Sequence, residues 1–397
     1  DFSDAFFMIP LSKAEQRYFV ASYRGKYFVW LRVAQGSING PNLFGRLSAL
    51  VGRITQACFS PDRVRLQIYQ DDPCAVLMGT KQECSRYAST MLCLWILLGF
   101  SLATHKAQLG SEVTWIGYLF SIQDKLVRAS IKQSFMDEFA AATKTLLGKN
   151  VVGLKELRRY TGQANHIAGL LYGWRPFLDG LWAAITTAEQ SQSTSSSSSR
   201  RRGSRAPHHM IWTKQVESSL GWLHLFLSRQ RGTISREWYF ESFAEPEGFL
   251  SMILDASPFG LGGILTLNGR IIAWFASPLT SLDSKRFGCE LGDSSGQQVW
   301  EALCILVALT AWQSHWMKRK VALTLKSDNH SALTIASQLK ARRNRTLIAK
   351  ELSLLYSESS YEPSFYTHIP GVTNVLSDSL SRLWDPSKSD KVPKQLL

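Results

Sequence analysis

Apolar and polar residues follow two different periods in the first third of the chain. Between Pro41 and Cys58, apolar residues recur at helical spacing, at positions 43, 44, 47, 50, 51 and 54. A proline suits the first turn of such a helix. From Val64 to Tyr69, apolar and polar residues alternate as in a half-buried strand, and a second apolar run begins at Ala75. The pattern therefore predicts a helix followed by a hairpin.

The two strands of this hairpin meet at Asp71 and Asp72, which places two carboxylates at its tip. Two like charges held there repel each other, so the arrangement needs a cation to be useful. After the hairpin, Thr80-Lys-Gln-Glu83 fits a capping box, and the helix that it opens runs towards Gly99. Residues 1–120 therefore alternate helix, hairpin, helix and strand, which predicts an α+β arrangement.

The remainder of the chain has a different pattern. Residues 131–189 look mostly helical, and 249–385 mixes the two types of element in the order three strands, helix, strand, helix, strand, helix. The expected elements are 249–254, a hairpin from 261 to 275, 298–312, 321–325, 331–357, 364–369 and a short helix after 371. The hairpin turns at Asn268-Gly269, which is the strongest short-range hairpin signal.

A break in composition separates these parts. Residues 190–209 are rich in serine and arginine and cannot bury apolar surface, so we expect a flexible linker. The run Arg200-Arg-Arg202 with Arg205 leaves two alternatives. It is either a solvated segment with positive charge, or a segment that grips phosphate or serves as a nuclear address.

Length and charge narrow the function classes. A chain of 397 residues can form two to four domains, and its net charge of +14 indicates a polyanionic partner, with nucleic acid ahead of anionic membrane. The sequence contains no apolar run of about 18 residues, so no membrane span is predicted. The six cysteines lack paired metal-ligand spacing and are expected to be reduced core residues of an intracellular protein. Because the sequence begins at Asp1 without Met, we expect a fragment or a processed product.

Two segments resemble the catalytic motifs of reverse transcriptases. Tyr69-Gln-Asp71-Asp72 resembles the metal-binding hairpin, and the opening residues Asp1 to Leu11 resemble motif A of retroelement members of the family. The resemblance implies that Asp1, Asp71 and Asp72 bind two divalent cations, which activate the primer 3′-hydroxyl and hold the triphosphate. Phe6 matches the aromatic gate that clashes with a ribose 2′-hydroxyl, which implies deoxynucleotide substrates.

Further segments resemble other motifs of this family in the same order. Residues 35–44 resemble motif B, which implies that Gln35 touches the incoming nucleotide or the template and that Gly36 lets the backbone approach the nascent base pair. Residues 99–106 resemble motif D, in which Lys106 would protonate the leaving pyrophosphate. Trp115-Ile-Gly117-Tyr118 resembles the primer grip, and residues 154–162 look like the thumb helix that tracks the duplex.

Four acids in the C-terminal part resemble the carboxylates of ribonuclease H: Asp255, Glu301, Asp328 and Asp378. In that family they converge at one sheet edge and bind two metals, one activating water and the other stabilising the leaving oxygen. His368 matches the mobile histidine of the retroviral type, which implies a proton shuttle or an aid to product release. The ending around Asp378 is most similar to gypsy-type and DIRS-type retrotransposons.

The resemblance covers nearly the whole chain and implies its fold class. We expect an α+β and α/β multidomain protein with a right-hand polymerase palm and a helical thumb. A ribonuclease H-like domain with a mixed five-stranded sheet and flanking helices would follow. The expected domains are a palm with partial fingers at 1–120, a thumb or connection at 121–189, the linker at 190–209, a connection segment at 210–248, the nuclease-like domain at 249–385 and a tail at 386–397.

The implied function is that of an RNA-directed DNA polymerase with a fused ribonuclease H from a retrotransposon. The implied cofactors are two Mg²⁺ or Mn²⁺ ions per active site. The implied partners are an RNA template, a DNA primer, an RNA–DNA hybrid and deoxynucleoside triphosphates, with other products of the same polyprotein as further candidates and no membrane. The expected location is intracellular, in a cytoplasmic element particle or the nucleus.

Two expectations qualify this function. The upstream fingers of the family have no counterpart in these residues, so we expect weak or absent polymerase activity from them. The alternative function is a non-catalytic nucleic-acid-binding remnant of a decayed or domesticated retroelement, although all seven expected carboxylates are present. Catalysis would require divalent metal and fail after carboxylate neutralisation, whereas binding would survive and weaken with salt.

Overall fold

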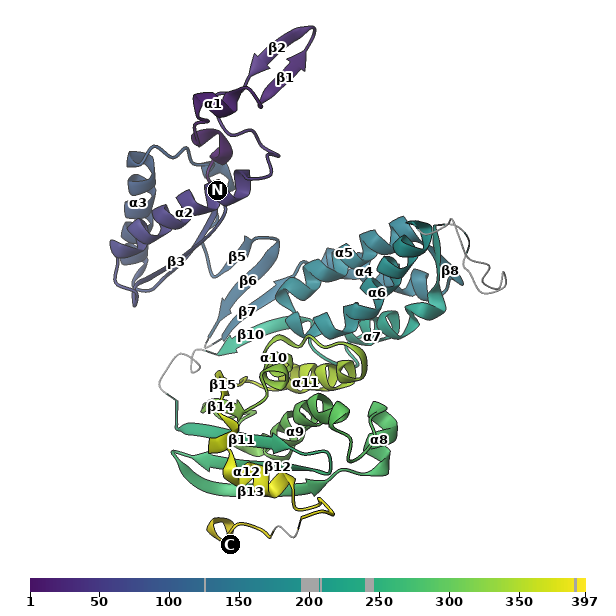
Figure 1. The fold of residues 1–397 in the computed structure, drawn as a ribbon. Coiled ribbons are helices and arrows are strands. Elements are labelled where there is room, and N and C mark those ends of the chain that lie inside the picture. The colour runs from purple at the N-terminus through teal and green to yellow at the C-terminus, as the bar shows by residue number, and fades with distance from the viewer. Residues whose placement is uncertain (125, 194–206, 208, 240–245, 389–390) are drawn as a thin grey trace. The chain divides into compact units, whose positions relative to one another are not determined.

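The computed structural model describes residues 1–124, 126–193, 207, 209–239, 246–388 and 391–397 (Figure 1). They form two compact units, unit 1 at Asp1–Phe120 and unit 2 at Ser121–Leu397. Within the described residues, no helix is long and apolar enough to cross a membrane.

Unit 1 combines helices with short antiparallel strands. Its elements are η1 (Ala5–Met8), α1 (Lys13–Gln16), β1 (Val20–Tyr23), β2 (Lys26–Val29), α2 (Gly40–Ala57), β3 (Val64–Tyr69), β4 (Asp72–Leu77), α3 (Lys81–Leu97), η2 (Thr104–Lys106), β5 (Glu112–Trp115) and the start of β6 (Tyr118–Gln123). The predicted helix, the predicted hairpin and the capping box that opens α3 are all present. In that box the Thr80 backbone N–H donates to Glu83 Oε2 at 2.7 Å.

The core of unit 1 lies between α2, α3 and the β3–β4 hairpin. Its buried members are Phe2, Ala5, Phe44, Val51, Val64, Met91, Trp95 and Phe100. The indole N–H of Trp95 donates to the Thr55 hydroxyl at 2.9 Å, which satisfies a buried donor. Because Phe2 is 1% exposed, it anchors the first residues of the chain against this core.

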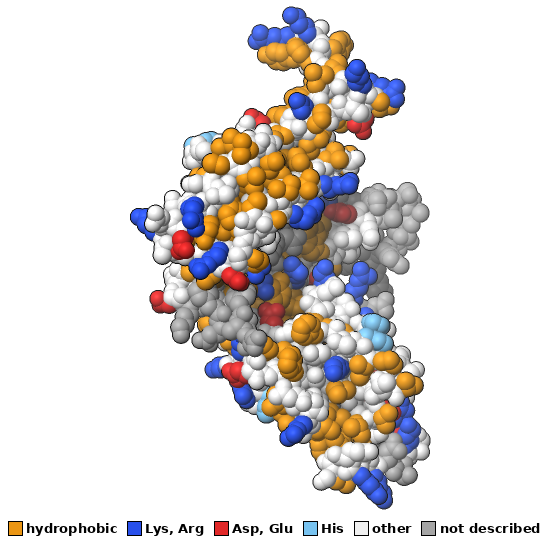
Figure 2. Space-filling model, turned by 90° about the vertical axis from the view of Figure 1, so that its left-hand side faces the viewer, with side chains coloured by type: hydrophobic (Ala, Val, Ile, Leu, Met, Phe, Trp, Pro, Cys, Tyr) orange, Lys and Arg blue, Asp and Glu red, His pale blue; other side chains and the backbone are white. Residues whose placement is uncertain are grey.

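One hairpin of unit 1 was not expected from the sequence. β1 and β2 pair through a two-residue turn in which Arg24 and Gly25 have φ values of 50° and 76°. Positive φ at both turn residues matches the twist of hairpin strands. Large apolar side chains on this hairpin stay exposed, with Tyr23 at 62% and Tyr27 at 80%. Figure 2 shows hydrophobic side chains beside Lys and Arg on this part of the surface.

Unit 2 begins with a helical layer. Its elements are β7 (Leu126–Ile131), α4 (Gln133–Leu147), β8 (Val151–Gly153), α5 (Leu154–Leu170), η3 (Tyr172–Trp174), α6 (Arg175–Ser193), β9 (Met210–Trp212), η4 (Thr213–Gln215), α7 (Glu217–Leu227) and β10 (Ser235–Tyr239). The mostly helical character predicted for 131–189 is confirmed. Strand β10 pairs antiparallel with β7, and β9 pairs with β8.

The first residues of the linker expected at 190–209 are part of a helix. Helix α6 continues through Ser193, so residues 190–193 are helical. Ala, Glu and Gln at 188–190 are strong helix formers, and the Arg158 side chain on α5 donates from Nε to Glu189 at 2.9 Å. The rest of that predicted linker, at 194–206 and 208, lies outside the described residues.

The remaining part of unit 2 is built on a five-stranded mixed sheet in the order β13-β12-β11-β14-β15. The strands are β11 (Phe249–Ala256), β12 (Gly260–Leu267), β13 (Arg270–Pro278), β14 (Ala322–Ser327) and β15 (Phe365–His368). β11 pairs antiparallel with β12 and parallel with β14, which in turn pairs parallel with β15. The predicted turn at Asn268-Gly269 is confirmed, with φ values of 51° and 82°.

Five helices accompany this sheet: α8 (Ser281–Phe287), α9 (Gln297–Ala311), α10 (His330–Gln338), α11 (Thr346–Glu358) and α12 (Val375–Ser381). Helices α9 and α12 pack against β11 and β12. The prediction of a single helix at 331–357 is wrong, because α10 ends at Gln338 and the next residue, Leu339, adopts a left-handed φ of 54°. The predicted fold class, α+β and α/β with a five-stranded mixed sheet and flanking helices, is confirmed.

Candidate functional site

Three carboxylates converge at one edge of the five-stranded sheet. Asp255 lies near the end of β11, Glu301 lies on α9, and Asp328 directly follows β14. Within the described part of the chain, these three residues form a cluster that could hold a metal ion, because one carboxylate oxygen of each lies within 4.8 Å of the others. Parallel pairing of β11 with β14 brings Asp255 and Asp328 to the same edge.

Burial strongly perturbs two of these acids. Asp255 and Glu301 are each 4% exposed. Desolvation raises the pKa of Asp255 to about 7, against a smaller lowering by the Ser381 hydroxyl, and the nearby carboxylates of Asp378 and Asp328 raise it further. Desolvation also holds the pKa of Glu301 well above its usual range, and the charge of Asp255 adds to this effect.

The residues of this cluster fit a divalent cation. Glu301 Oε1 accepts a hydrogen bond from Gln297 at 2.9 Å, but Glu301 Oε2 is buried without a hydrogen-bond partner. A buried acceptor without a partner is unfavourable, and so are neighbouring like charges in a desolvated site. Oxygen ligands from carboxylates are those that Mg²⁺ and Mn²⁺ prefer, so a cation here would relieve both.

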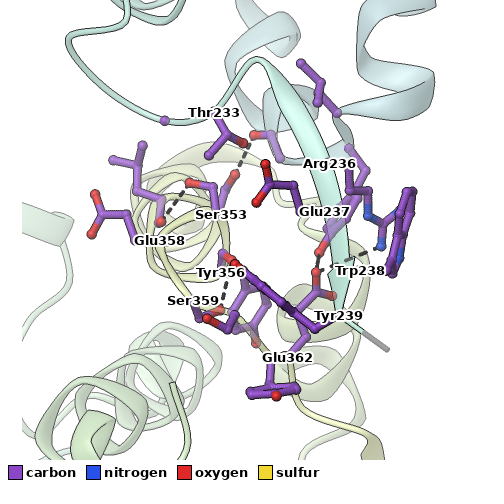
Figure 3. A pocket seen from close by; sticks show the side chains of 18 of the residues that line it. Thr233, Arg236, Glu237, Trp238, Tyr239, Ser353, Tyr356, Glu358, Ser359 and Glu362 are labelled. Atoms are coloured by element: carbon purple, nitrogen blue, oxygen red, sulfur yellow. Dashed lines mark hydrogen bonds and ion pairs between the residues drawn. The ribbon is translucent and has the colours of Figure 1, made fainter. Parts of the chain in front are cut away.

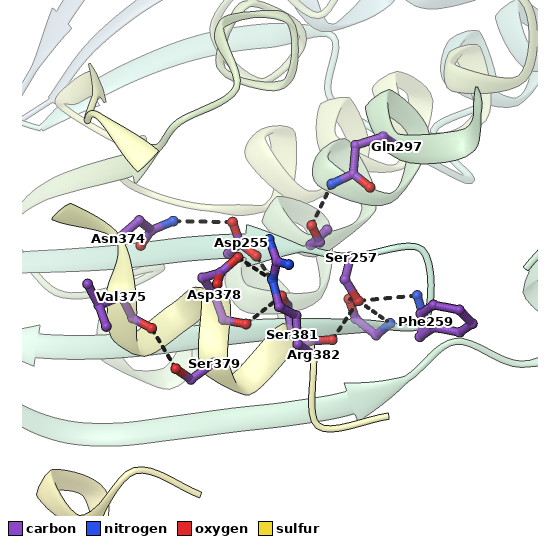
Figure 4. Close-up of polar contacts among 12 residues, drawn as sticks. Asp255, Ser257, Phe259, Gln297, Asn374, Val375, Asp378, Ser379, Ser381 and Arg382 are labelled. Atoms are coloured by element: carbon purple, nitrogen blue, oxygen red, sulfur yellow. Dashed lines mark hydrogen bonds and ion pairs between the residues drawn. The ribbon is translucent and has the colours of Figure 1, made fainter. Parts of the chain in front are cut away.

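Helix α12 supplies hydrogen bonds that hold Asp255 (Figure 4). The Ser381 hydroxyl donates to Asp255 Oδ2 at 2.6 Å, and Asn374 Nδ2 lies 3.0 Å from the Leu254 carbonyl and 3.4 Å from Asp255 Oδ1. Ser377 donates to the Ile253 carbonyl at 3.0 Å. The end of β11 is therefore fixed by side chains of Asn374, Ser377 and Ser381.

Asp378 and His368 lie beside the cluster but outside the three-carboxylate group. Asp378 Oδ1 accepts from Arg382 Nε at 2.6 Å, so this carboxylate has its own cationic partner. The His368 Nε2 atom lies 3.0 Å from the backbone carbonyl of Asp328. Its ring stacks on that of His330, with centroids 3.9 Å apart and planes 4° apart.

Unit 1 carries the second set of predicted carboxylates. Tyr69 pairs with Asp72 across the hairpin, so Gln70 and Asp71 form its turn, and Gln70 adopts a left-handed φ of 55°. The backbone N–H of Phe2 donates to the Asp71 carbonyl at 2.7 Å. This bond places the first residues of the chain beside the tip of the hairpin.

Asp1 is paired with a cationic side chain in this arrangement. Its Oδ2 atom lies 2.6 Å from Lys106 Nζ, and its carbonyl accepts from the Ala103 N–H at 3.0 Å. In the described residues, Asp1, Asp71 and Asp72 do not form a close three-carboxylate group like the one in unit 2. The two predicted sites therefore differ in how far their acids are already assembled.

The other predicted residues of unit 1 surround this hairpin or lie on loops. The Trp115 indole donates to the Asp72 carbonyl at 2.9 Å, which ties the predicted primer-grip hairpin to the carboxylates. Gly117 turns that hairpin with a φ of 84°. Phe6 is half-buried, 5.6 Å from the ring of Phe44. The loop residues Gln35 and Gly36 are both exposed.

Unit 2 also contains a basic groove of about 1430 Å³ between its helical layer and helices α10 and α11. Its lining includes five cationic side chains: Arg175, Lys340, Arg342, Arg345 and Lys350. It includes one carboxylate, Asp179, whose pKa is raised by desolvation. His330, which stacks on His368, lies on the same lining. Such a groove attracts polyanions.

A second cavity, of about 830 Å³, lies between β10 and the segment around α11 (Figure 3). The Arg236 guanidinium lies 4.6 Å from the ring centre of Tyr172 and 5.0 Å from that of Trp238. It is also 3.9 Å from Glu362, which accepts a hydrogen bond from Tyr172. These contacts join the helical layer of unit 2 to its sheet domain.

The first part of the chain is similar to known proteins. Residues 1–120 match the family described as reverse transcriptase (RNA-dependent DNA polymerase). The Gag-Pol polyprotein of Walleye dermal sarcoma virus is 29% identical over 130 residues, and the Pol polyprotein of Feline endogenous virus ECE1 is 31% identical over 128 residues. These alignments cover 32% and 30% of this chain, but 7% and 12% of the relatives. They support the resemblance of this region to retroviral and retroelement reverse transcriptases.

Solved structures of foamy viral protease-reverse transcriptase are also similar. One complex with dsDNA is 17% identical, covers 93% of this chain and 56% of that chain, and has a TM-score of 0.47. A complex with an RNA/DNA hybrid is 18% identical, covers 94% and 44%, and has a TM-score of 0.42.

Proposed function

We propose that this chain is the reverse transcriptase and ribonuclease H region of a retrotransposon polyprotein, of gypsy or DIRS type. It would copy RNA into DNA and degrade the RNA strand of the resulting hybrid. The family match of residues 1–120 supports the polymerase. The observation that carries the nuclease is the cluster of Asp255, Glu301 and Asp328 at the sheet edge, in which Asp255 and Glu301 are buried. The element type rests on the sequence around Asp378.

In the nuclease, Asp255, Glu301 and Asp328 would hold divalent cations. The bound cations would supply an activated water and stabilise the charge that develops on the leaving oxygen. Asp378 would become a further ligand of these cations after its hydrogen bond with Arg382 breaks. His368, which the Asp328 carbonyl and the His330 ring hold at the rim of the cluster, would move a proton or help the product to leave.

In the polymerase, Asp1, Asp71 and Asp72 would hold the cations at the primer terminus. Asp1 must first release Lys106, and the freed ammonium would then face the pyrophosphate. Trp115 holds the β4 strand through its bond to the Asp72 carbonyl, so it would couple the primer position to the carboxylates. Phe6 would select deoxynucleotides.

The proposed partners are an RNA template, a DNA primer, an RNA–DNA hybrid and deoxynucleoside triphosphates, together with other products of the same polyprotein. The basic groove supports a nucleic-acid partner, because its lining includes five cationic side chains and one carboxylate. The net charge of +14 supports the same class of partner.

The nuclease is tested by incubating the chain with a labelled RNA–DNA hybrid in Mg²⁺ or Mn²⁺. We expect the RNA strand alone to be cut, EDTA to stop cutting, and Asp328→Asn to abolish it. Asp385→Asn is the matched control, because this acid bonds Ser387 outside the cluster. Undiminished cutting by Asp328→Asn would refute the assigned site.

The polymerase is tested by primer extension on an RNA template. We expect Asp71→Asn to remove any extension that the unsubstituted chain supports, while hybrid cleavage persists. If the chain binds hybrids in a salt-dependent way but neither extends nor cuts under any metal condition, the non-catalytic remnant is the correct function instead.

A further inference from the structure

Ser381 makes a short side-chain hydrogen bond to Asp255. It is the last residue of α12 and is fully buried. Its hydroxyl lies 2.6 Å from Asp255 Oδ2, across 126 residues of sequence (Figure 4). A hydrogen bond to a carboxylate at this distance is of the strong, charge-assisted kind.

The backbone around Ser381 is held in place independently of this bond. The Ser257 hydroxyl donates to the Ser381 carbonyl at 2.7 Å. A Cβ at Gly262 would lie 2.4 Å from the Ser377 carbonyl and 2.6 Å from the Ser381 nitrogen, so only glycine allows α12 to approach β12 this closely. Ser381 is therefore presented to Asp255 by a fixed helix rather than by a mobile loop.

The two oxygens of Asp255 have unequal surroundings as a result. Oδ2 receives the 2.6 Å bond from Ser381, whereas Oδ1 has a longer contact of 3.4 Å with Asn374. The nearest guanidinium, on Arg382, is engaged by Asp378 at 2.6 Å. Oδ2 is thus anchored by a short bond, whereas Oδ1 has a long contact that a ligand could replace.

We infer that Ser381 is a positioning residue for Asp255. The Ser381 hydroxyl holds Oδ2 of Asp255, so that Oδ1 of Asp255 faces Glu301 and Asp328 and binds a divalent cation with them. The inference rests on the proposed function for the identity of the ligand, but it concerns cation binding rather than the reaction. Residues that orient metal ligands in this way typically change metal affinity by about 10- to 100-fold when they are removed.

The test compares two serines of one helix. Ser377 and Ser381 are both fully buried on α12, and each donates to β11, but Ser377 donates to the Ile253 carbonyl and not to a carboxylate. Mn²⁺ binding is measured by electron paramagnetic resonance on the full chain, with no nucleic acid present. We expect Ser381→Ala to weaken binding by about 10-fold or more, and Ser377→Ala to change it by less than about 3-fold.

A double-mutant cycle isolates the pair. In an Asp255→Ala background, Ser381→Ala should have no further effect on Mn²⁺ affinity, because the side chain that accepts its hydrogen bond is gone. If thermal unfolding shows that Ser381→Ala does not fold, Ser381→Cys and Ser377→Cys replace the alanine pair, since a thiol is only a weak donor. Equal losses for the two serine positions, or an undiminished affinity for Ser381→Ala, would overturn the inference.

These outcomes separate this inference from the proposed function. If the chain binds Mn²⁺ and Ser381→Ala weakens that binding but no hybrid is cut, Ser381 positions Asp255 and the nuclease assignment fails. If hybrids are cut with the same Mn²⁺ requirement after Ser381→Ala, the nuclease stands and the role of Ser381 is wrong. Absence of Mn²⁺ binding in the unsubstituted chain would contradict both.

Discussion

The burial of Asp255 predicts that, without a divalent cation, unit 2 loses stability as the pH rises from weakly acidic to alkaline. The pKa of Asp255 is raised from 3.8 to about 7 in the folded chain. Between these values the folded state binds more protons than the unfolded state, so the free energy of unfolding falls as the pH rises. Above about pH 7 both states are ionised and this contribution is constant.

The size of the effect follows from the shift in pKa. One pKa unit corresponds to about 1.4 kcal/mol, so ionising Asp255 in the folded state costs on the order of 4 kcal/mol over the whole range. Between about pH 5.5 and pH 8, roughly 2 kcal/mol of this is expressed. The raised pKa of Glu301 acts in the same direction. The pKa of Asp385 is lowered from 3.8, so its ionisation changes the free energy of unfolding below pH 3.8 and thus outside this pH window.

The assay is thermal or urea unfolding in EDTA at constant ionic strength, comparing the unsubstituted chain with Asp255→Asn. The asparagine keeps an oxygen that can accept from Ser381 but cannot ionise. We expect the stability gained through Asp255→Asn to be larger at about pH 8 than at pH 5.5 by roughly 2 kcal/mol. Titrating groups that do not interact with Asp255 are common to both proteins and cancel in this difference. The charge of Asp255 helps to raise the pKa of Glu301, so that pKa is lower in Asp255→Asn and the change adds to the difference.

Addition of Mg²⁺ provides the opposing change. A ligand at about 100 times its dissociation constant stabilises the folded state by about 2.7 kcal/mol. The gain should be larger at alkaline pH, where the carboxylates are ionised, and should be lost in Asp255→Asn. The reasoning is refuted if Asp255→Asn shows the same pH dependence as the unsubstituted chain, or if it destabilises unit 2 more at alkaline than at acidic pH.

Three smaller predictions test other contacts. Replacing Lys340 and Arg342 together by Gln should weaken hybrid binding and reduce the slope of log affinity against log salt by about 2, which salt titrations would measure. Trp115→Phe removes the bond to the Asp72 carbonyl and should lower the free energy of unfolding of unit 1 by about 1 kcal/mol in urea denaturation. Thr80→Ala removes the hydroxyl of the capping box and should cost about 1 kcal/mol in the same assay.

Elements with strong local chemistry could be predicted from the sequence. The Asn268-Gly269 turn, the box opened by Thr80 and the alternation from Val64 to Tyr69 all have counterparts in the structure. The break between α10 and α11 could not be predicted, because Leu339 adopts a left-handed conformation that its side chain disfavours. The β1–β2 hairpin was missed because its exposed strands lack an alternating pattern.

The acids of the sheet-edge site could be named from the sequence, but not their surroundings. Glu301 lies on a helix and Asp328 follows a strand, as predicted, whereas Asp255 lies within β11 rather than after it. Ser381 gave no signal, because one serine among several in a short segment has no distinctive spacing. Its significance depends on a contact across 126 residues, which only the packing of α12 on the sheet creates.

The two carboxylate sites differ in a way that bears on how each would accept a cation. In unit 2, Asp255 and Glu301 are desolvated and Glu301 Oε2 has no hydrogen-bond partner, so folding of the chain has already brought these acids together at a cost in free energy. In unit 1, Asp1 is paired with Lys106, and the two side chains are 24% and 58% exposed. An exposed ion pair contributes less than about 1 kcal/mol, so a divalent cation can displace the ammonium at little cost. The unassembled state of unit 1 is therefore compatible with a metal site that forms when cation and nucleotide arrive together.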